Sequence, residues 1–189
     1  MPRIPLLHPR DASKEVRDTY DDFRRRMQFP APPNFIMTQG HSVTVARGTW
    51  DLVRNVLVTG DIPRWTKEMI FGAISKDRNC HYCLAAHIAC CRMLGVNPQT
   101  LEDLVRDVRS IADAKVRDMI LFALQCSRDP QALTEDDFDT VRRHGLHDAQ
   151  IMELIAMSAL AVYANIVADA TGMEADAIFD QIQPAPVAV

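Results

Sequence analysis

Residues 79–91, NCHYCLAAHIACC, hold four cysteines and two histidines within thirteen positions. Cys80 and Cys83 form a C-x-x-C pair, and His87 follows four residues after the second cysteine. On a helix, residues three, four and seven apart share one face, so these three side chains would project together within two turns. A thiol becomes a good nucleophile only after it loses its proton, and an imidazole one turn away can accept that proton. The spacing therefore predicts a redox-active dithiol with its own base.

Two other chemistries could use the same stretch. Covalent haem attachment requires histidine directly after the second cysteine, and that position holds Leu84, which excludes it. Zinc would need a fourth ligand, or three ligands and a water, beyond Cys80, Cys83 and His87. Candidates for that ligand are Glu68, Cys90 and Cys91. Because no second C-x-x-C pair follows elsewhere, the sequence favours a site without metal, and zinc binding stays an alternative.

The remaining cysteines are interpreted as core residues, because free cysteine behaves as a small and commonly buried side chain. They are Cys90, Cys91 and Cys126, of which Cys90 lies three residues beyond His87 on the same helix face. Glu68 lies twelve residues before Cys80, in the middle of the preceding predicted helix. If these two helices pack antiparallel, the Glu68 carboxylate can reach His87 and orient its ring.

Composition narrows the class of protein. The chain has 189 residues and 48% hydrophobic content, enough for one compact domain with a sizeable core. A net charge of −4 gives no electrostatic reason to expect nucleic acid or an anionic membrane as a partner. The longest apolar stretch, 151–170, carries Glu153, Asn165 and Asp169 and is interpreted as a buried helix rather than a membrane span. Without an export signal we expect a cytoplasmic protein whose cysteines are reduced.

The elements that must position these residues are helices throughout, because apolar residues recur at helical spacing and no run alternates with period two. The sequence predicts an all-α fold. Residues 29–35, FPAPPNF, are expected to cross in an extended conformation. Helices are predicted over 13–27, 42–60, 62–78, 80–95, 98–109, 113–127, 134–144, 148–171 and 173–181.

The chain also repeats itself at an offset of fifty residues. KEMIFGAISKDR (67–78) falls on RDMILFALQCSR (117–128), and Gly95 then falls on Gly145. A constant offset through two helices and a glycine stop favours an internal duplication. Its second copy, about 117–155, is degenerate, because Cys80, Cys83 and His87 fall opposite Pro130, Leu133 and Asp137. We therefore expect a single domain over 1–183, with the redox motif in 68–87 and a loose tail at 184–189.

Glu68 and CHYCLAAH together give the pattern E-x11-C-x-x-C-x3-H. This pattern resembles the AhpD-like alkylhydroperoxidase branch of the carboxymuconolactone decarboxylase family. The segments IPLLHP, VRDTYDDF, PPNF, LTEDDFDTVRRHGL and AVYANIVADATGM are similar to peroxidase-related members of that family. The resemblance implies an all-helical fold, homo-oligomers (often trimers or hexamers), and thiol-dependent reduction of hydroperoxides without a bound cofactor.

Carried onto this sequence, the resemblance makes Cys83 the attacking thiol, Cys80 the resolving thiol, His87 the base and Glu68 its relay partner. An external dithiol or thiol protein would then reduce the resulting disulfide. The spacing alone leaves the reverse order open, because Cys80 lies nearer the helix N-terminus, where a thiolate is favoured.

One position departs from the family pattern. Members can carry a second relay histidine directly before the second cysteine, where this chain has Tyr82. His81 is one step away and points about 100° elsewhere on a helix, as a surface residue would. Two further functions therefore stay open: a thiol-disulfide oxidoreductase or redox sensor with little peroxidase turnover, and a zinc-binding or non-catalytic helical oligomer.

Overall fold

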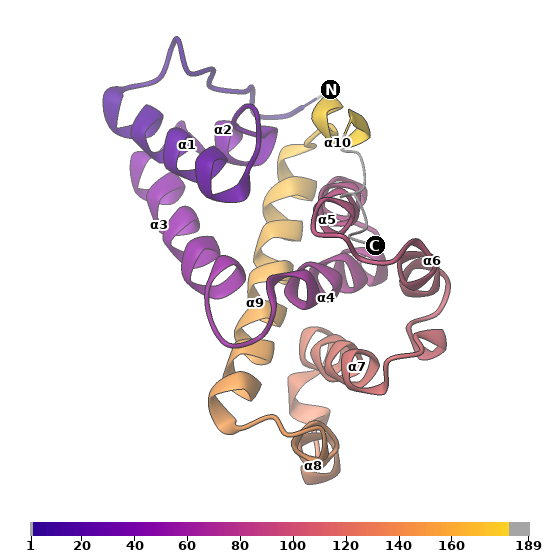
Figure 1. Cartoon of the computed structure of the whole chain (residues 1–189). Helices are drawn as coiled ribbons and strands as arrows, with labels where there is room; N and C mark the ends of the chain where they lie inside the picture. The colour runs from indigo at the N-terminus through magenta and orange to yellow at the C-terminus, as the bar shows by residue number, and fades with distance from the viewer. Residues whose placement is uncertain (1, 182–189) are drawn as a thin grey trace.

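The computed structural model describes residues 2–181, and in that part of the chain every regular element is a helix (Figure 1). This confirms the all-α prediction; the predicted tail at 184–189 lies outside the described residues. The α-helices are α1 (Lys14–Met27), α2 (Asn34–Gln39), α3 (Val43–Val53), α4 (Arg64–Asp77), α5 (His81–Met93), α6 (Pro98–Arg106), α7 (Ala114–Arg128), α8 (Glu135–Arg143), α9 (Asp148–Thr171) and α10 (Ala177–Gln181).

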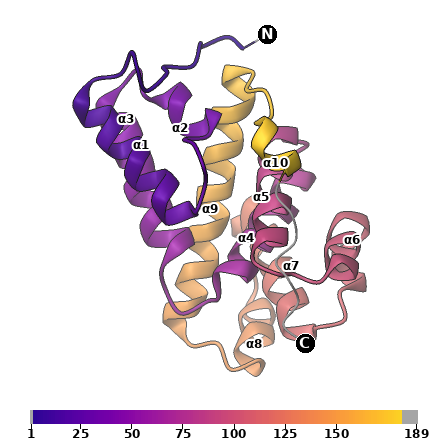
Figure 2. The same ribbon diagram turned by 45° about the horizontal axis from the view of Figure 1, so that its top comes forward.

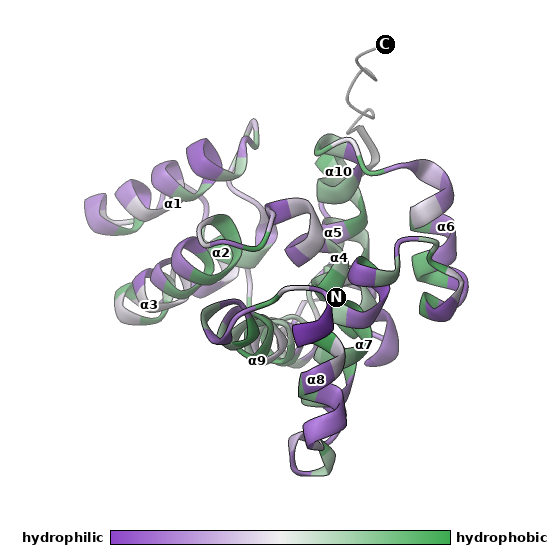
Figure 3. Ribbon diagram, turned by 60° about the horizontal axis from the view of Figure 1, so that its bottom comes forward, coloured by the Kyte–Doolittle hydropathy of each residue, from purple (hydrophilic) through white to green (hydrophobic). Residues whose placement is uncertain are grey.

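The centre of the molecule is formed by α4, α5 and α9. In Figures 1 and 2 the long α9 has α1, α2 and α3 on one side, and α4 to α7 on the other. Ile70 and Ile74 of α4 and Leu154 and Met157 of α9 are fully buried in this core. The hydropathy colouring follows the same division, with α4, α5 and α9 mainly apolar and α8 and the outer face of α1 mainly polar (Figure 3).

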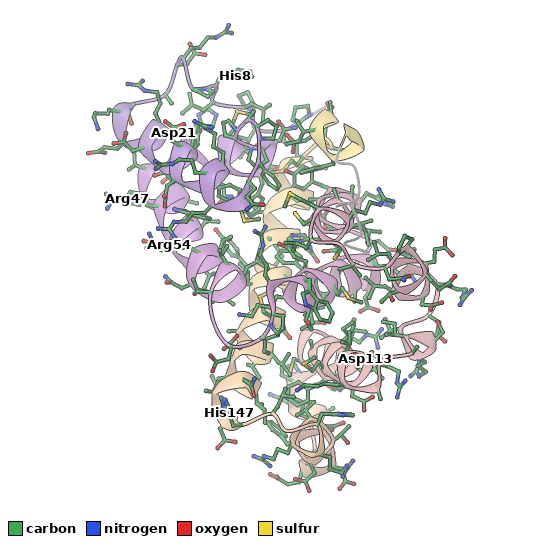
Figure 4. All side chains as sticks on the ribbon, viewed as in Figure 1. His8, Asp21, Arg47, Arg54, Asp113 and His147 are labelled. Carbon is green, nitrogen blue, oxygen red and sulfur yellow. The ribbon has the colours of Figure 1, made fainter. Side chains whose placement is uncertain are left out.

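Charged residues gather on the rim rather than in this centre. Asp21, Arg47 and Arg54 lie on the outer side of α1 and α3, and His147 lies at the start of α9 (Figure 4). The helix ends are satisfied locally: the Ser13 side chain accepts from the Val16 N–H at the start of α1. The interior is mainly apolar, and its buried polar side chains include Glu68, His87 and Asn165 of the site and Lys67 outside it.

α9 is long and apolar enough, by length and composition, to cross a membrane. Half of its most apolar window is buried inside the protein, and its buried positions recur along the whole helix. A core helix passes the same test. The packing agrees with the prediction that this segment is a buried helix.

The predicted fifty-residue offset is visible in the elements. α4 begins at Arg64 and α7 at Ala114, while α6 begins at Pro98 and α9 at Asp148. Gly95 and Gly145, which follow α5 and α8, have φ of 78° and 82°, the left-handed conformation that glycine adopts without a Cβ clash. Two helical units thus follow one backbone plan.

Three predicted segments differ from the structure. The sequence predicts no helix after the prolines at 29–33, yet Asn34–Gln39 forms α2. Pro33 has an extended backbone conformation and is the N-cap residue from which this short helix starts. The helix predicted over 42–60 ends as an α-helix at Val53 and continues as a π-helical turn, Arg54–Val58. The last predicted helix starts at Ala177 rather than 173.

Candidate active site

α5 begins at the dithiol. Asn79 has a positive φ of 58°, and the Cys80 N–H donates to the Ser75 carbonyl at 2.9 Å, which turns the chain from α4 into α5. Cys80 is the N-cap residue of α5 and Cys83 lies in its first turn. Both thiols are free and buried, with exposed fractions of 0% and 2%. The predicted pair is therefore formed at the N-terminus of a helix and is shielded from solvent.

The two thiols divide the charge unequally. The Cys83 S–H donates to the Cys80 sulfur, and this bond, with the Cys83 backbone N–H, lowers the pKa of Cys80 despite its burial. The same hydrogen bond, together with burial, raises the pKa of Cys83. When the pair loses one proton, the negative charge is thus held mainly by Cys80, where the helix N-terminus stabilises it.

Glu68 reaches His87 as the antiparallel packing predicts. His87 Nδ1 donates to Glu68 Oε2 at 2.5 Å, and Arg64 Nε donates to the other carboxylate oxygen at 3.0 Å. Burial pushes the pKa of Glu68 up, but the charges and hydrogen bonds of His87 and Arg64 outweigh it and hold the pKa below its usual value. A buried carboxylate of this kind stays ionised and fixes the histidine tautomer.

The His87 ring is also held from its face. It stacks on Phe71 with ring centroids 3.5 Å apart and an interplanar angle of 16°. With Nδ1 committed to Glu68, Nε2 is the nitrogen that can take a proton. In the described part of the chain the ring makes no hydrogen bond to either thiol, but His87 and Cys83 line the same pocket.

That pocket is apolar and narrow. Its cavity is about 50 Å³, close to the volume of one or two water molecules. Cys90 also lines it, whereas Cys80 does not. The wall is made of Phe23, Met27, Phe29, Pro33, Phe35, Val53, Leu57, Phe71, Tyr82, Cys83, Ala86, His87, Cys90, Ala164 and Phe179. A molecule that enters this pocket therefore meets Cys83 rather than Cys80.

A buried amide, Asn165, bonds to the Cys83 side of the dithiol. Asn165 is fully buried in α9, and its Nδ2 donates to Ser75 Oγ at 3.0 Å. Asn165 also forms a hydrogen bond that favours the Cys83 thiolate. Its Oδ1 has no partner among the described residues. Buried amides are normally satisfied, so the unpaired oxygen of a residue that also bonds to Cys83 marks a polar position near the two thiols.

The predicted site residues come together, and their catalytic roles stay predictions. Cys91 is buried and Cys126 half-buried, as predicted for core residues, and His81 is exposed. Cys90 is buried too, but on the pocket wall. In the described residues no group of three or more Cys, His, Asp or Glu side chains is placed to hold a metal ion, so the zinc alternative gains no support.

Sequence reasoning missed Arg64, Phe71 and the partner of Tyr82. Arg64 precedes Glu68 by four residues, a helical spacing that could have indicated the ion pair. Phe71 follows Glu68 by three residues on the same face. Tyr82 donates to Asp176 Oδ2 at 2.8 Å, a contact across 94 residues that no local pattern signals.

Residues 45–125 match the model of the carboxymuconolactone decarboxylase family. The fold is similar to that of an alkylhydroperoxidase AhpD core protein, an uncharacterized peroxidase-related protein from Ralstonia eutropha JMP134, with a TM-score of 0.88 and 23% identity over 97% of this chain and 98% of that one. A peroxidase-related protein from Silicibacter sp. TM1040 gives a TM-score of 0.83 and 26% identity, covering 94% of each chain.

A third similar structure is a cysteine-to-alanine variant of the debrominase Bmp8 in complex with 2,3,4-tribromopyrrole. It has a TM-score of 0.81 and 19% identity, over 95% of this chain and 94% of that one. A search of curated proteins by sequence finds no significant match. The comparisons thus agree with the resemblance noted from the C-x-x-C pattern.

Proposed function

We propose that the chain is a thiol-dependent hydroperoxide reductase, because residues 45–125 match the carboxymuconolactone decarboxylase family model and the fold is similar to that of an AhpD core protein. The observation that carries the proposal is the buried Glu68–His87 pair beside a free dithiol on an apolar pocket. Cys83 attacks, Cys80 resolves, His87 moves the proton and Glu68 orients His87.

The cycle balances with no bound cofactor. The dithiol first passes one proton to His87. The Cys83 thiolate attacks the distal oxygen of ROOH, the O–O bond breaks, and the departing alkoxide takes that proton from His87 to leave as ROH. Cys83 is then a sulfenic acid. Cys80 attacks its sulfur, water leaves, and the Cys80–Cys83 disulfide remains. An external dithiol, either a small molecule or a thiol protein, reduces this disulfide and is itself oxidised.

Access and charge give the two thiols different tasks. Cys83 lies on the pocket wall and Cys80 does not, so Cys83 is the thiol of this pair that an entering peroxide meets. Cys80 holds the negative charge of the resting pair and accepts the hydrogen bond from Cys83. A shift of that shared proton to Cys80 therefore generates the attacking Cys83 thiolate without removing a second proton from a buried site.

The test counts thiols against peroxide. Prereduced protein is mixed with one equivalent of hydrogen peroxide or cumene hydroperoxide, and free thiols are counted before and after in wild type, Cys80→Ser and Cys83→Ser. We expect two thiols lost per peroxide in wild type, a dimedone-reactive sulfenic acid on Cys83 in Cys80→Ser, and no fast phase in Cys83→Ser. A sulfenic acid on Cys80 would reverse the two assignments. Thiols that ignore peroxide but exchange with a dithiol would replace peroxidase with the oxidoreductase or sensor.

A second candidate is reductive dehalogenation of an aromatic ring. The aromatic side chains around Cys83, and the fold shared with a debrominase bound to a tribromopyrrole, favour it. The balanced reaction converts an aryl bromide and two thiols into the arene, bromide, a proton and the disulfide. The test measures bromide release from 2,3,4-tribromopyrrole by the reduced protein. If bromide is released faster than hydroperoxide is consumed, dehalogenation replaces peroxide reduction as the proposed function.

The proposed homo-oligomer has a matching surface feature. Four large apolar side chains on α3 and α9 are exposed, namely Val45, Leu52, Met152 and Ile166. Where such side chains form one contiguous patch, the patch marks an interaction site such as an interface between copies. Sedimentation equilibrium of the reduced protein measures the subunit number, for which the family resemblance implies three or six. We keep a cytoplasmic location as part of the proposal, because it supplies the reductants that the cycle needs.

A further inference from the structure

One carboxylate connects the segment before α10 to the dithiol helix and to α2. Asp176 accepts the Tyr82 hydroxyl at 2.8 Å through Oδ2, and it accepts the backbone N–H of Asn34 at 2.9 Å through Oδ1. The Tyr82 oxygen in turn accepts the Phe35 N–H at 3.0 Å. Four residues from three segments that are distant in sequence are thus joined in one network, which we call the Tyr82–Asp176 clasp.

The clasp lies in a shielded place. Tyr82 is only 6% exposed, and Asp176 is half-buried. Burial and the Asp176 charge raise the pKa of Tyr82 well above its usual value. The phenol therefore stays protonated and donates a hydrogen bond to the carboxylate. Hydrogen bonds to a charged acceptor in a shielded site are stronger than those between neutral groups. The clasp is therefore a defined connection rather than a transient surface contact.

The segment that the clasp holds supplies part of the pocket wall. Phe179 of α10 is 5% exposed and packs edge-on against Tyr82 and Phe29, with ring centroids 6.0 and 6.1 Å away. Phe179, Tyr82 and Cys83 line the same cavity. Tyr82 directly precedes Cys83 in the chain, so the residue that fixes the wall adjoins the thiol that the wall covers.

The cavity is too small for most organic hydroperoxides. Its volume is about 50 Å³, whereas pockets for drug-sized ligands occupy about 300–1,000 Å³. α10 is a five-residue helix, whereas α5 and α9 are long core helices. A displacement of α10 therefore costs less than a displacement of α5 or α9.

We propose that the Tyr82–Asp176 clasp holds α10 as a closed wall of the pocket, so that Phe179 limits the size of the R group that reaches Cys83. Tyr82 and Asp176 are positioning residues, and Phe179 is a specificity-determining residue. The proposal rests on the function proposed above for the same site. It implies that hydrogen peroxide and small alkyl hydroperoxides react faster than bulky aromatic ones.

The test compares kcat/KM for cumene hydroperoxide and hydrogen peroxide. Phe179→Ala removes the ring, and Tyr82→Phe and Asp176→Asn weaken the clasp. We expect the cumene-to-hydrogen-peroxide ratio to rise about tenfold in Phe179→Ala and about threefold in the two clasp variants. Tyr163→Phe is the matched control, because the Tyr163 hydroxyl bonds to Thr49 away from the pocket. An unchanged ratio in folded Phe179→Ala overturns the proposal, as does an equal loss with both peroxides.

A second readout does not need peroxidase activity. The reduced dithiol is alkylated with N-phenylmaleimide and with iodoacetamide, and the ratio of the two rates is compared across the same variants. A rise in the ratio for Phe179→Ala supports the size limit even if wild type consumes no peroxide, in which case only the proposed function fails. If the ratio of the two alkylation rates stays constant while peroxide turnover is normal, the proposed size limit is wrong and the proposed function stands.

Discussion

The helix pairs α4–α5 and α7–α8 follow one backbone plan, and both contain a carboxylate bonded to a histidine. In the first pair Glu68 bonds to His87 at 2.5 Å, and the Glu68 side chain is fully buried. In the second, Asp118 occupies the position fifty residues after Glu68 and bonds to His144 at 2.7 Å. The side chains of His144 and Asp118 are 25% and 21% exposed to solvent. A carboxylate–histidine pair thus exists in a buried and in a partly solvated setting, although His144 follows the end of α8 and the position fifty residues after His87 is Asp137.

The larger difference lies in the first turn of the second helix. α5 starts directly after Cys80, whereas α8 starts at Glu135, after a short 3-10 turn, Pro130–Ala132. A capping box between Thr134 and Asp137 begins α8, where α5 begins with a thiol. The comparison teaches that the carboxylate–histidine pair alone does not make the site. Burial of that pair, and a helix N-terminus that carries thiols, distinguish the first unit.

The largest effect should come from exchanging a cysteine in each unit. We expect Cys83→Ser to lower peroxide turnover at least about a thousandfold, because the nucleophile is lost. Cys126→Ser, in α7, should leave turnover unchanged, since Cys126 is half-buried and does not line the pocket. Stopped-flow peroxide consumption measures both. Comparable losses in the two variants would break the distinction between the units.

The carboxylates give the next largest effect. Glu68→Gln keeps the shape but removes the charge that orients His87, and we expect kcat/KM to fall about 10- to 100-fold. The free energy of unfolding should also fall by about 2 kcal/mol, because a buried charge-assisted hydrogen bond is weakened. Asp118→Asn should cost under about 1 kcal/mol and no activity, as for a solvated pair. Denaturant unfolding and steady-state rates test both; a larger loss of stability in Asp118→Asn would contradict the contrast.

The sequence was sufficient for the contacts that helical geometry dictates. The spacing of Cys80, Cys83 and His87 follows from one helix, and the Glu68–His87 contact follows from antiparallel packing of two adjacent helices. The fifty-residue offset predicted the shared helix starts for the same reason, since caps and glycine stops are local signals. All of these depend on residues within about one helix pair of each other.

Contacts between distant segments could not be predicted in this way. Asp176 reaches Tyr82 from the other end of the chain, and Phe179 completes the pocket from a five-residue helix with no periodic pattern. Lys67 is fully buried because it donates to the Val56 carbonyl and pairs with Glu153, although a lysine on a helix is expected at the surface. Such partners depend on tertiary packing, which single-sequence periodicity does not encode.

The thiols should titrate differently in the two units. The pKa of Cys80 is lowered from 9.0, first by the Cys83 S–H bond, whereas burial raises the pKa of Cys126. Thiolate absorbance at 240 nm of reduced protein should therefore show one group ionising below pH 9, and Cys80→Ser should abolish this early step while Cys126→Ser keeps it. An early step that survives Cys80→Ser would assign the charge to another thiol.

The sign of the accompanying stability change follows from linkage. Because the folded pKa of Cys80 lies below its unfolded value, the folded state binds fewer protons between the two values. Stability from this group is complete above the unfolded pKa and is lost as the pH falls through the folded pKa. Urea unfolding across that interval should show stability that rises with pH in wild type and a flatter profile in Cys80→Ser.

The smallest effects should be alike in the two units. Gly95 and Gly145 both have positive φ after the second helix of their pair, and a Cβ at Gly145 meets no atom within 4 Å. Gly145→Ala should therefore cost only the backbone strain of a left-handed alanine, about 1 kcal/mol. Gly95→Ala should cost a similar amount if the two turns are equivalent, and neither should change kcat, because neither glycine lies on the pocket. Thermal unfolding and peroxide turnover of both variants test this. Equal losses of stability would establish that the units share a backbone plan independent of chemistry, whereas a much larger loss in Gly95→Ala would show that the turn after the dithiol helix is constrained by more than its own conformation.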